Sequence, residues 1–166
     1  MAEKMANVAN KILDSWYLIP GASNDGSIDE EKLMKWIEDA RKCCEKTKHT
    51  TGGDIQIGFL LAHAPADSDG VWPHISVRNI IEKLSNPIIE SHIENEIYNS
   101  RGVVSRNPYD GGKQERDLAE KYNGMSQIMR IKWPRTSTML RSIAESYEHC
   151  AQREDLDSDL RDLCRN

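Results

Sequence analysis

The stretch Asn99-Ser-Arg-Gly-Val-Val-Ser-Arg-Asn-Pro-Tyr-Asp-Gly-Gly-Lys-Gln-Glu-Arg116 separates two helical patterns, and the second half of the chain has no longer run without helical periodicity. Its three glycines let the backbone adopt positive φ angles, and a loop held between rigid elements often carries binding residues. We therefore expect one long loop near residues 99–116 that serves as a recognition surface. The side chains chosen as its binding residues are Arg101, Arg106, Tyr109, Asp110, Gln114 and Arg116.

Before this loop, apolar residues recur at helical spacing in five segments, near residues 5–16, 28–44, 55–64, 73–84 and 87–97. Three of the segments are preceded by residues that typically cap a helix. Ser27 and Glu30 have the spacing of a capping box, Asp54 can cap the third segment, and Asn86 is followed by a first-turn proline. These signals predict five helices in the first part of the chain.

After the loop, helical spacing returns in three segments, near residues 117–132, 137–151 and 156–163. No sustained β alternation bounded by hairpin turns occurs anywhere in the chain. The sequence therefore predicts an all-α fold, a compact single-domain bundle of about seven to eight helices over residues 1–166. The residues expected in its core are Trp16, Trp36, Phe59, Leu61, Ile81, Ile93, Tyr122, Leu140 and Tyr147.

Composition limits the classes of function. A chain of 166 residues fits one domain, and a net charge of -5 argues against a general nucleic-acid coat. No run approaches the ~18 apolar residues that a membrane span needs. The four cysteines form no Cys-x-x-Cys pair, so neither a disulfide framework nor a zinc knuckle is predicted. We expect a cytoplasmic protein with reduced thiols.

Motifs for metals and catalysis are incomplete. Residues 24–29 imitate the middle of a calcium-binding loop, but Gly21 and Lys32 stand where its first and last ligands belong. The histidines show no pair at the spacing of a helical zinc site, and the P-loop and the nucleophile-elbow motif are absent. We expect no metal and no cofactor, and the sequence leans against an enzyme.

One segment differs in charge from the rest of this acidic chain. Between Glu120 and Glu145 the chain has no acidic residue. The simplest interpretation is a solvated face whose cations pair with carboxylates of other helices. The functional interpretation is a site for an anion or an acidic partner near a helix N-terminus, with a tryptophan as a stacking surface. The residues of this alternative site are Lys121, Arg130, Lys132, Trp133, Arg135 and Arg141.

Several short stretches together resemble a known kind of domain. They are residues 16–21, Asp25-Gly-Ser-Ile-Asp29, Ile57-Gly-Phe-Leu-Leu-Ala62, Asp69-Gly-Val-Trp-Pro73, Asn99-Ser-Arg-Gly-Val103, Gly111-Gly-Lys-Gln-Glu-Arg116 and Ile143-Ala-Glu-Ser-Tyr147. In these stretches the chain resembles an uncharacterised bacterial all-α domain found toward the C-termini of larger multidomain bacterial proteins. The resemblance implies an accessory or scaffolding module, and it implies no particular activity.

Three hypotheses of function follow. The first is a non-catalytic helical module of a bacterial system that binds another protein through the loop at residues 99–116. The second is a binder of a phosphate-bearing ligand or nucleic acid, which would use the basic residues around Trp133 together with Arg101 and Arg106. The third is an enzyme in which Asp110 or Glu115 acts as a base.

Overall fold

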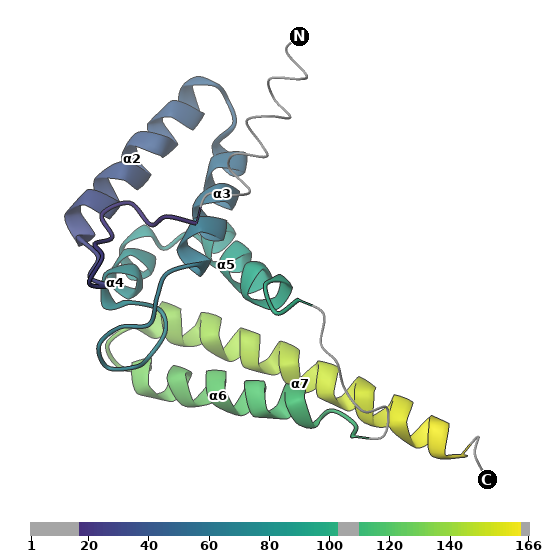
Figure 1. The fold of residues 1–166 in the computed structure, drawn as a ribbon. Helices are drawn as coiled ribbons and strands as arrows, with labels where there is room; N and C mark the ends of the chain where they lie inside the picture. Colours follow the sequence, from purple (N-terminus) through teal and green to yellow (C-terminus); the bar gives the residue numbers. More distant parts are fainter. Residues whose placement is uncertain (1–16, 103–109, 164–166) are drawn as a thin grey trace. The chain divides into compact units, whose positions relative to one another are not determined.

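The computed structural model describes residues 17–102 and 110–163 (Figure 1). Within these ranges the chain forms six α-helices, labelled α2 to α7, and no β-strand, so the all-α prediction is confirmed. The expected number of seven to eight helices is wrong for the described residues. The helix predicted near residues 5–16 lies outside them.

The two predicted C-terminal helices form one helix, α7 (Pro134–Leu163), because no glycine or proline interrupts the chain between them.

The contacts between residues group the chain into two compact units, one ending at Ile93 and one beginning at Glu94. Each is described by itself. The expectation of one helical domain over residues 1–166 stays a prediction.

The first unit contains α2 (Glu30–Lys46), α3 (Thr50–Ala62), α4 (Ile75–Leu84) and the beginning of α5 (Pro87–Asn99). Each of these helices buries aliphatic side chains, and Gly58 of α3 lies close against the backbone of α5. A Cβ at Gly58 would lie 2.6 Å from the carbonyl oxygen of Ile89. The buried aliphatic residues of the four helices include Leu33, Ile37, Ile57, Leu60, Leu61, Val77, Ile80, Ile81, Ile89 and Ile93.

Helix starts in this unit follow the sequence signals only in part. Asn86 caps α5 as predicted, since its side-chain oxygen accepts a hydrogen bond of 2.9 Å from the Ile88 amide. The predicted capping box at Ser27 and Glu30 is wrong. Asp29 caps α2 by accepting from the Lys32 amide at 3.0 Å, and Glu30 instead binds Asn79 and Lys83 of α4. A carboxylate one residue before the helix provides the same capping oxygen as a serine.

Asp54 does not cap α3, contrary to the prediction, because α3 begins four residues earlier, at Thr50. The Asp54 side chain is buried inside the unit. It forms an ion pair with Arg41 of α2 (Nε to Oδ1, 2.9 Å) and accepts a hydrogen bond of 2.7 Å from the Asn86 side chain. A buried carboxylate needs such partners, since an unpaired buried charge is strongly destabilising.

A buried arginine holds the segment that precedes α4. Arg78 is 0% exposed, and its Nε donates to the Pro73 carbonyl at 2.6 Å. Its two terminal nitrogens donate to the Asp69 carboxylate at 2.8 and 3.0 Å, and one of them also donates to the Val71 carbonyl. This bidentate geometry is the one in which arginine pairs most strongly with a carboxylate, and it holds the Asp69 pKa at about 2. Arg78 therefore fixes residues 69–73 to the start of α4.

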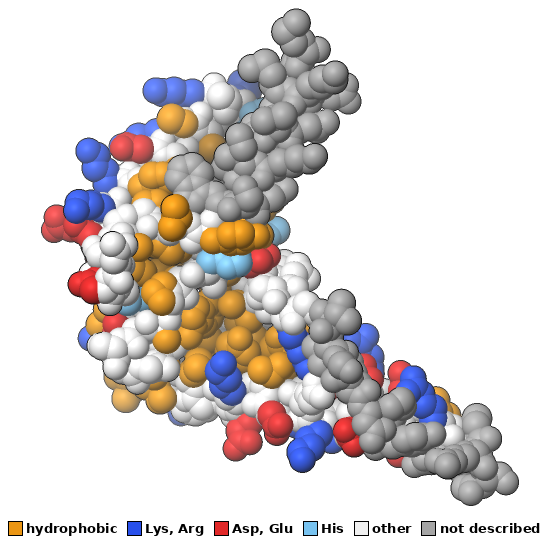
Figure 2. Space-filling view, viewed as in Figure 1, with side chains coloured by type: hydrophobic (Ala, Val, Ile, Leu, Met, Phe, Trp, Pro, Cys, Tyr) orange, Lys and Arg blue, Asp and Glu red, His pale blue; other side chains and the backbone are white. Residues whose placement is uncertain are grey.

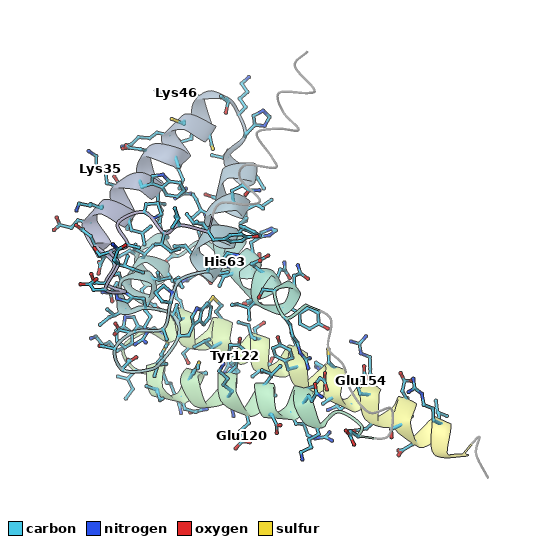
Figure 3. The ribbon with its side chains drawn as sticks, in the orientation of Figure 1. Lys35, Lys46, His63, Glu120, Tyr122 and Glu154 are labelled. Atoms are coloured by element: carbon cyan, nitrogen blue, oxygen red, sulfur yellow. The ribbon has the colours of Figure 1, made fainter. Side chains whose placement is uncertain are left out.

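The second unit is built on an antiparallel pair of helices, α6 (Lys113–Met129) and α7, which lie side by side (Figure 1). Tyr122 points from α6 toward α7, whereas Glu120 points away from it (Figure 3). The rings of Tyr122 and Tyr147 are stacked, with centroids 5.8 Å apart and an interplanar angle of 5°. At the other end of the pair, the hydroxyls of Ser126 and Ser137 each donate to the other residue's carbonyl at 2.9 Å.

The start of α6 lies very close to α7. A Cβ at Gly112 would lie 2.3 Å from the Cα and the carbonyl oxygen of Ala151, so only glycine fits there without a shift of the backbone. Because α6 begins at Lys113, residues 113–116 are helical and do not belong to the predicted loop. The loop itself is shorter than expected, and its described residues are 100–102 and 110–112.

The predicted core is confirmed at five of its nine positions, Leu61, Ile81, Ile93, Leu140 and Tyr147, which are buried. Trp36, Phe59 and Tyr122 are half-buried. Trp16 lies outside the described residues. Large aromatic side chains are often only partly buried, because a small unit cannot enclose every ring.

Candidate functional site

The candidate recognition surface at residues 99–116 lies in the second unit. Two of its six chosen residues, Arg106 and Tyr109, lie outside the described residues. At the N-terminal end of the loop, Arg101 forms an ion pair with Glu115 (2.8 Å), and the Glu115 side chain is only 2% exposed. The Arg101 guanidinium also lies over the Tyr147 ring, 5.6 Å from its centroid. Arg101 therefore has internal partners that hold it against α6 and α7.

The C-terminal end of the loop has a similar arrangement. Arg116 donates to both oxygens of Asp155 on α7, at 2.6 and 3.0 Å, and the Gly112 amide donates to Asp155 at 2.9 Å. The Arg116 guanidinium and the Gly112 amide hold the pKa of Asp155 at about 2. Figure 2 shows basic and acidic side chains interspersed along this part of the molecule. Ion pairs thus attach both ends of the loop to the helix pair.

The remaining two binding residues differ in exposure. Asp110 is exposed, and Gln114 is half-buried in the first turn of α6. The structure therefore brings Arg101, Gln114 and Arg116 to the helix pair and leaves Asp110 at the surface. Recognition by this loop stays a prediction, and the ion pairs give Arg101 and Arg116 a structural role as well.

The Asp155 contacts predict a pH-dependent contribution to stability. Because the folded-state pKa of Asp155 is lowered from 3.8 to about 2, its charged form stabilises the fold above the unfolded pKa, and this contribution is lost as the pH falls toward 2. Asp155→Asn should therefore lower the melting temperature at about pH 6, and the difference from wild type should shrink between about pH 4 and pH 2. Circular dichroism melts measure both values.

Asp159→Asn is the matched control for this prediction. Asp159 is exposed on the same helix and forms no ion pair with any residue that the structure describes. Its replacement should leave the melting temperature nearly unchanged at both pH values. A difference between Asp155→Asn and wild type that is equally large at pH 6 and pH 2 would contradict the assignment.

The alternative site in the basic window is only partly assembled. Lys121 lies over the Tyr122 ring (5.7 Å to the centroid), and Lys132 lies over the Trp133 ring (4.3 Å). Trp133 is 9% exposed, which leaves little of its ring for the predicted stacking. Arg135 is half-buried. Lys121 lies in the middle of α6 and the other three lie in or next to the turn between α6 and α7, so the four residues do not form one site.

Arg130 and Arg141 are brought together, since both line a cavity of about 350 Å³ between the end of α6 and the first turns of α7. Ser126, Gln127, Ser137 and Thr138 complete most of its wall. The closest carboxylate contact of Arg141 is with Glu145, at 3.8 Å, and Arg130 forms no ion pair with any described carboxylate. The cavity therefore has a positive wall.

Sequence reasoning missed two exposed apolar residues beside this cavity. Ile128 and Ile131, called here the isoleucine patch, are 64% and 96% exposed. A signal for them exists in the sequence, because both fall outside the stripe at positions 118, 122, 125 and 129 that faces α7. Apolar residues outside the buried stripe of an amphipathic helix are candidates for contact with a partner.

Neither residue named for an enzyme lines one of the three cavities described in the second unit. Glu115 is almost fully buried and paired with Arg101, and Asp110 is exposed in the loop. Two further cavities of this unit, of about 360 and 520 Å³, are lined by different residues. Within the described parts of the chain, no three His, Cys, Asp or Glu side chains gather as a metal site would require. The expectations about catalysis and metals stay predictions.

No helix among those described is both long enough and apolar enough to cross a membrane. Comparison of the chain with protein-family models, with curated proteins and with solved structures finds no match.

Proposed function

We propose that this chain is a non-catalytic helical module that binds another protein, and that the isoleucine patch anchors the partner. The observation that carries the proposal is the exposure of Ile131, at 96%, with Ile128 beside it at 64%. Scattered apolar residues are normal on a surface. Two large aliphatic side chains three positions apart are a more specific feature, with Ile128 in the last turn of α6 and Ile131 two residues beyond its end.

The charges around the patch define the chemistry of the partner. Arg130 and Lys132 flank Ile131 in sequence, and residues 121–144 contain no acidic side chain. A partner segment with aliphatic anchors and acidic neighbours would complement this surface. Complementary charge increases the rate of association and disfavours partners of the wrong sign. Burial of the two isoleucines would supply most of the binding energy, at about 25 cal/mol per Å² of apolar surface.

The loop at residues 99–116 is a second proposed surface for the same kind of function. Arginine and tyrosine are frequent anchors of interfaces, which supports Arg106 and Tyr109 as contact residues. The ion pairs of Arg101 and Arg116 attach both described ends of this surface to α6 and α7. An accessory role within larger bacterial proteins, in the cytoplasm, is part of this proposal.

A binding experiment tests the isoleucine patch. The tagged chain is used to isolate a partner from a bacterial lysate, and the affinity is then measured with the purified partner. Ile131→Glu should weaken binding by about 30-fold or more, as at a central interface residue, because it places a charge in the apolar contact. Its melting temperature should stay close to that of wild type, since substitutions at exposed positions usually change stability by less than ~0.5 kcal/mol.

Leu160→Glu is the matched control, since Leu160 is an exposed aliphatic residue of α7 at 51% exposure. It should bind the partner as wild type does. Equal binding by wild type and Ile131→Glu would rule out the isoleucine patch. If Arg106→Ala and Tyr109→Ala weakened binding in that case, the loop would be the recognition surface.

A further inference from the structure

The cavity beside the α6–α7 turn has an unusual combination of size, charge and hydrogen-bonding groups. Its volume of about 350 Å³ lies in the range of sites for small ligands. Two arginines from different helices line it, Arg130 at the end of α6 and Arg141 on α7. No acidic side chain is among its lining residues. The arrangement is therefore one that attracts a small anion.

The donors available to a ligand can be identified from the hydrogen bonds of the wall. The hydroxyls of Ser126 and Ser137 donate to each other's carbonyl groups, and the Thr138 hydroxyl donates to the Pro134 carbonyl at 2.9 Å. These three hydroxyls have thus already used their protons. The side-chain donors that remain on the wall are the two guanidinium groups and the Gln127 amide.

The charge on these donors is poorly neutralised by the protein itself. Arg130 forms no ion pair with any carboxylate in the described part of the chain, and Arg141 has only the long contact with Glu145. The other cations of the basic window differ in this respect, since Lys121 and Lys132 each lie over an aromatic ring. The C-terminal end of α6 and the first turn of α7 both line the cavity, and because their partial charges are of opposite sign, the two guanidinium groups decide the charge of the wall.

We propose that this cavity binds a phosphate group, with Arg130 and Arg141 as its charged donors and Gln127 as a neutral one. Guanidinium groups match the tetrahedral oxygens of phosphate because each can donate two parallel hydrogen bonds. Inorganic phosphate and a small phosphate ester present the same oxygens, and the titration below distinguishes these two sources of the group. The site is separate from the proposed protein contact, since neither isoleucine of the patch lines the cavity.

Titration calorimetry with the whole chain tests this site. The probes are potassium phosphate and adenosine 5′-monophosphate, each compared with potassium chloride at the same low ionic strength, because salt screens exposed charges. Saturable binding is expected with at least one probe. Arg130→Gln or Arg141→Gln should each raise the dissociation constant by about tenfold or more, since a hydrogen bond to a charged group is lost.

Lys132→Gln is the matched control, because it removes one positive charge from the same window without touching the cavity wall. It should change the dissociation constant by less than about threefold. Tighter binding of the nucleotide would support a phosphate ester as the ligand, and equal binding of both probes would support the free anion.

Two results would overturn the site. One is the absence of saturable binding at millimolar concentrations of both probes. The other is equal weakening by all three substitutions, which would show diffuse attraction to positive charge. Arg130 and Arg141 are exposed, so their glutamine variants should fold, and unchanged melting temperatures would verify this. The phosphate titration uses the wild-type chain and its glutamine variants, whereas the Ile131→Glu test uses the purified partner, so the two proposals fail separately.

Discussion

Replacement of Arg78 by methionine is expected to lower the free energy of unfolding of the first unit by about 2–4 kcal/mol, since a buried acceptor that loses its donor costs ~1–3 kcal/mol, while the Asp69 side chain is 44% exposed and stays hydrated. Methionine fills much of the same volume but cannot donate to Asp69 or to the carbonyls of Val71 and Pro73. These carbonyls would lose their arginine donor. Because the Arg78 side chain is 0% exposed, the loss occurs in the interior of the unit. Urea denaturation followed by circular dichroism measures the loss.

Two further variants separate the causes of this effect. Arg78→Lys keeps the positive charge but has no planar fork, so it should recover only part of the stability. Lys83→Met removes a cation of the same helix whose side chain is 57% exposed and pairs with Glu30. An exposed pair contributes ~0–1 kcal/mol, so this control should change stability little. If Arg78→Met and Lys83→Met had equal effects, Arg78 would not fix residues 69–73 to α4.

Tyr147→Ala is expected to have a comparable effect on the second unit, a loss of about 3–5 kcal/mol, as for other buried aromatic residues. Tyr147 is 2% exposed and lies between two other rings, stacked on Tyr122 at 5.8 Å and tilted against Tyr98 at 5.7 Å. Alanine would leave a cavity where α5, α6 and α7 meet within this unit. Thermal and urea unfolding measure the change.

Tyr147→Phe is the control, because it keeps the ring and removes only the hydroxyl. Burial raises the pKa of Tyr147, and it raises the pKa of Tyr122 to about 12 with a smaller contribution from Tyr147, so both hydroxyls stay neutral at physiological pH. The phenylalanine variant should lose less than about 1 kcal/mol, within the usual range for a net hydrogen bond. A loss as large as that of alanine would show that the hydroxyl, and not the ring, stabilises the unit.

The helices were predictable because their signals are local. The periodic apolar residues of α2, α4 and α5 and the cap at Asn86 can each be read from a few neighbouring positions. The beginning of α3 was not predictable in the same way. Asp54 has the chemistry of a cap, but Arg41 and Asn86 provide long-range partners that let it lie inside the helix. Tertiary contacts outweigh a local preference that is worth about 1 kcal/mol.

The candidate site was less predictable than the fold. The charge asymmetry of residues 121–144 identified Arg130 and Arg141, but it did not show that these two share a cavity while Lys132 lies over Trp133. Whether a side chain of α6 is exposed depends on which side of the helix faces α7. Two neighbouring residues of the helix can therefore differ completely in exposure. Ile128 precedes the buried Met129, yet it is 64% exposed. A pattern of residue types alone could not give this geometry.

The contact at Gly112 has a consequence for the sequences that could adopt this helix pair. Because a Cβ at this position would overlap the backbone of Ala151, the two positions are constrained together. A distant relative that kept the pair would need glycine at the first position and a small residue at the second, whatever else had diverged. Between these two positions, a change of length would be tolerated at the α6–α7 turn rather than inside either helix, because connecting segments accept insertions more readily than the helices they join. This coupled pair offers a structural criterion for recognising kinship where overall similarity is too weak to detect it.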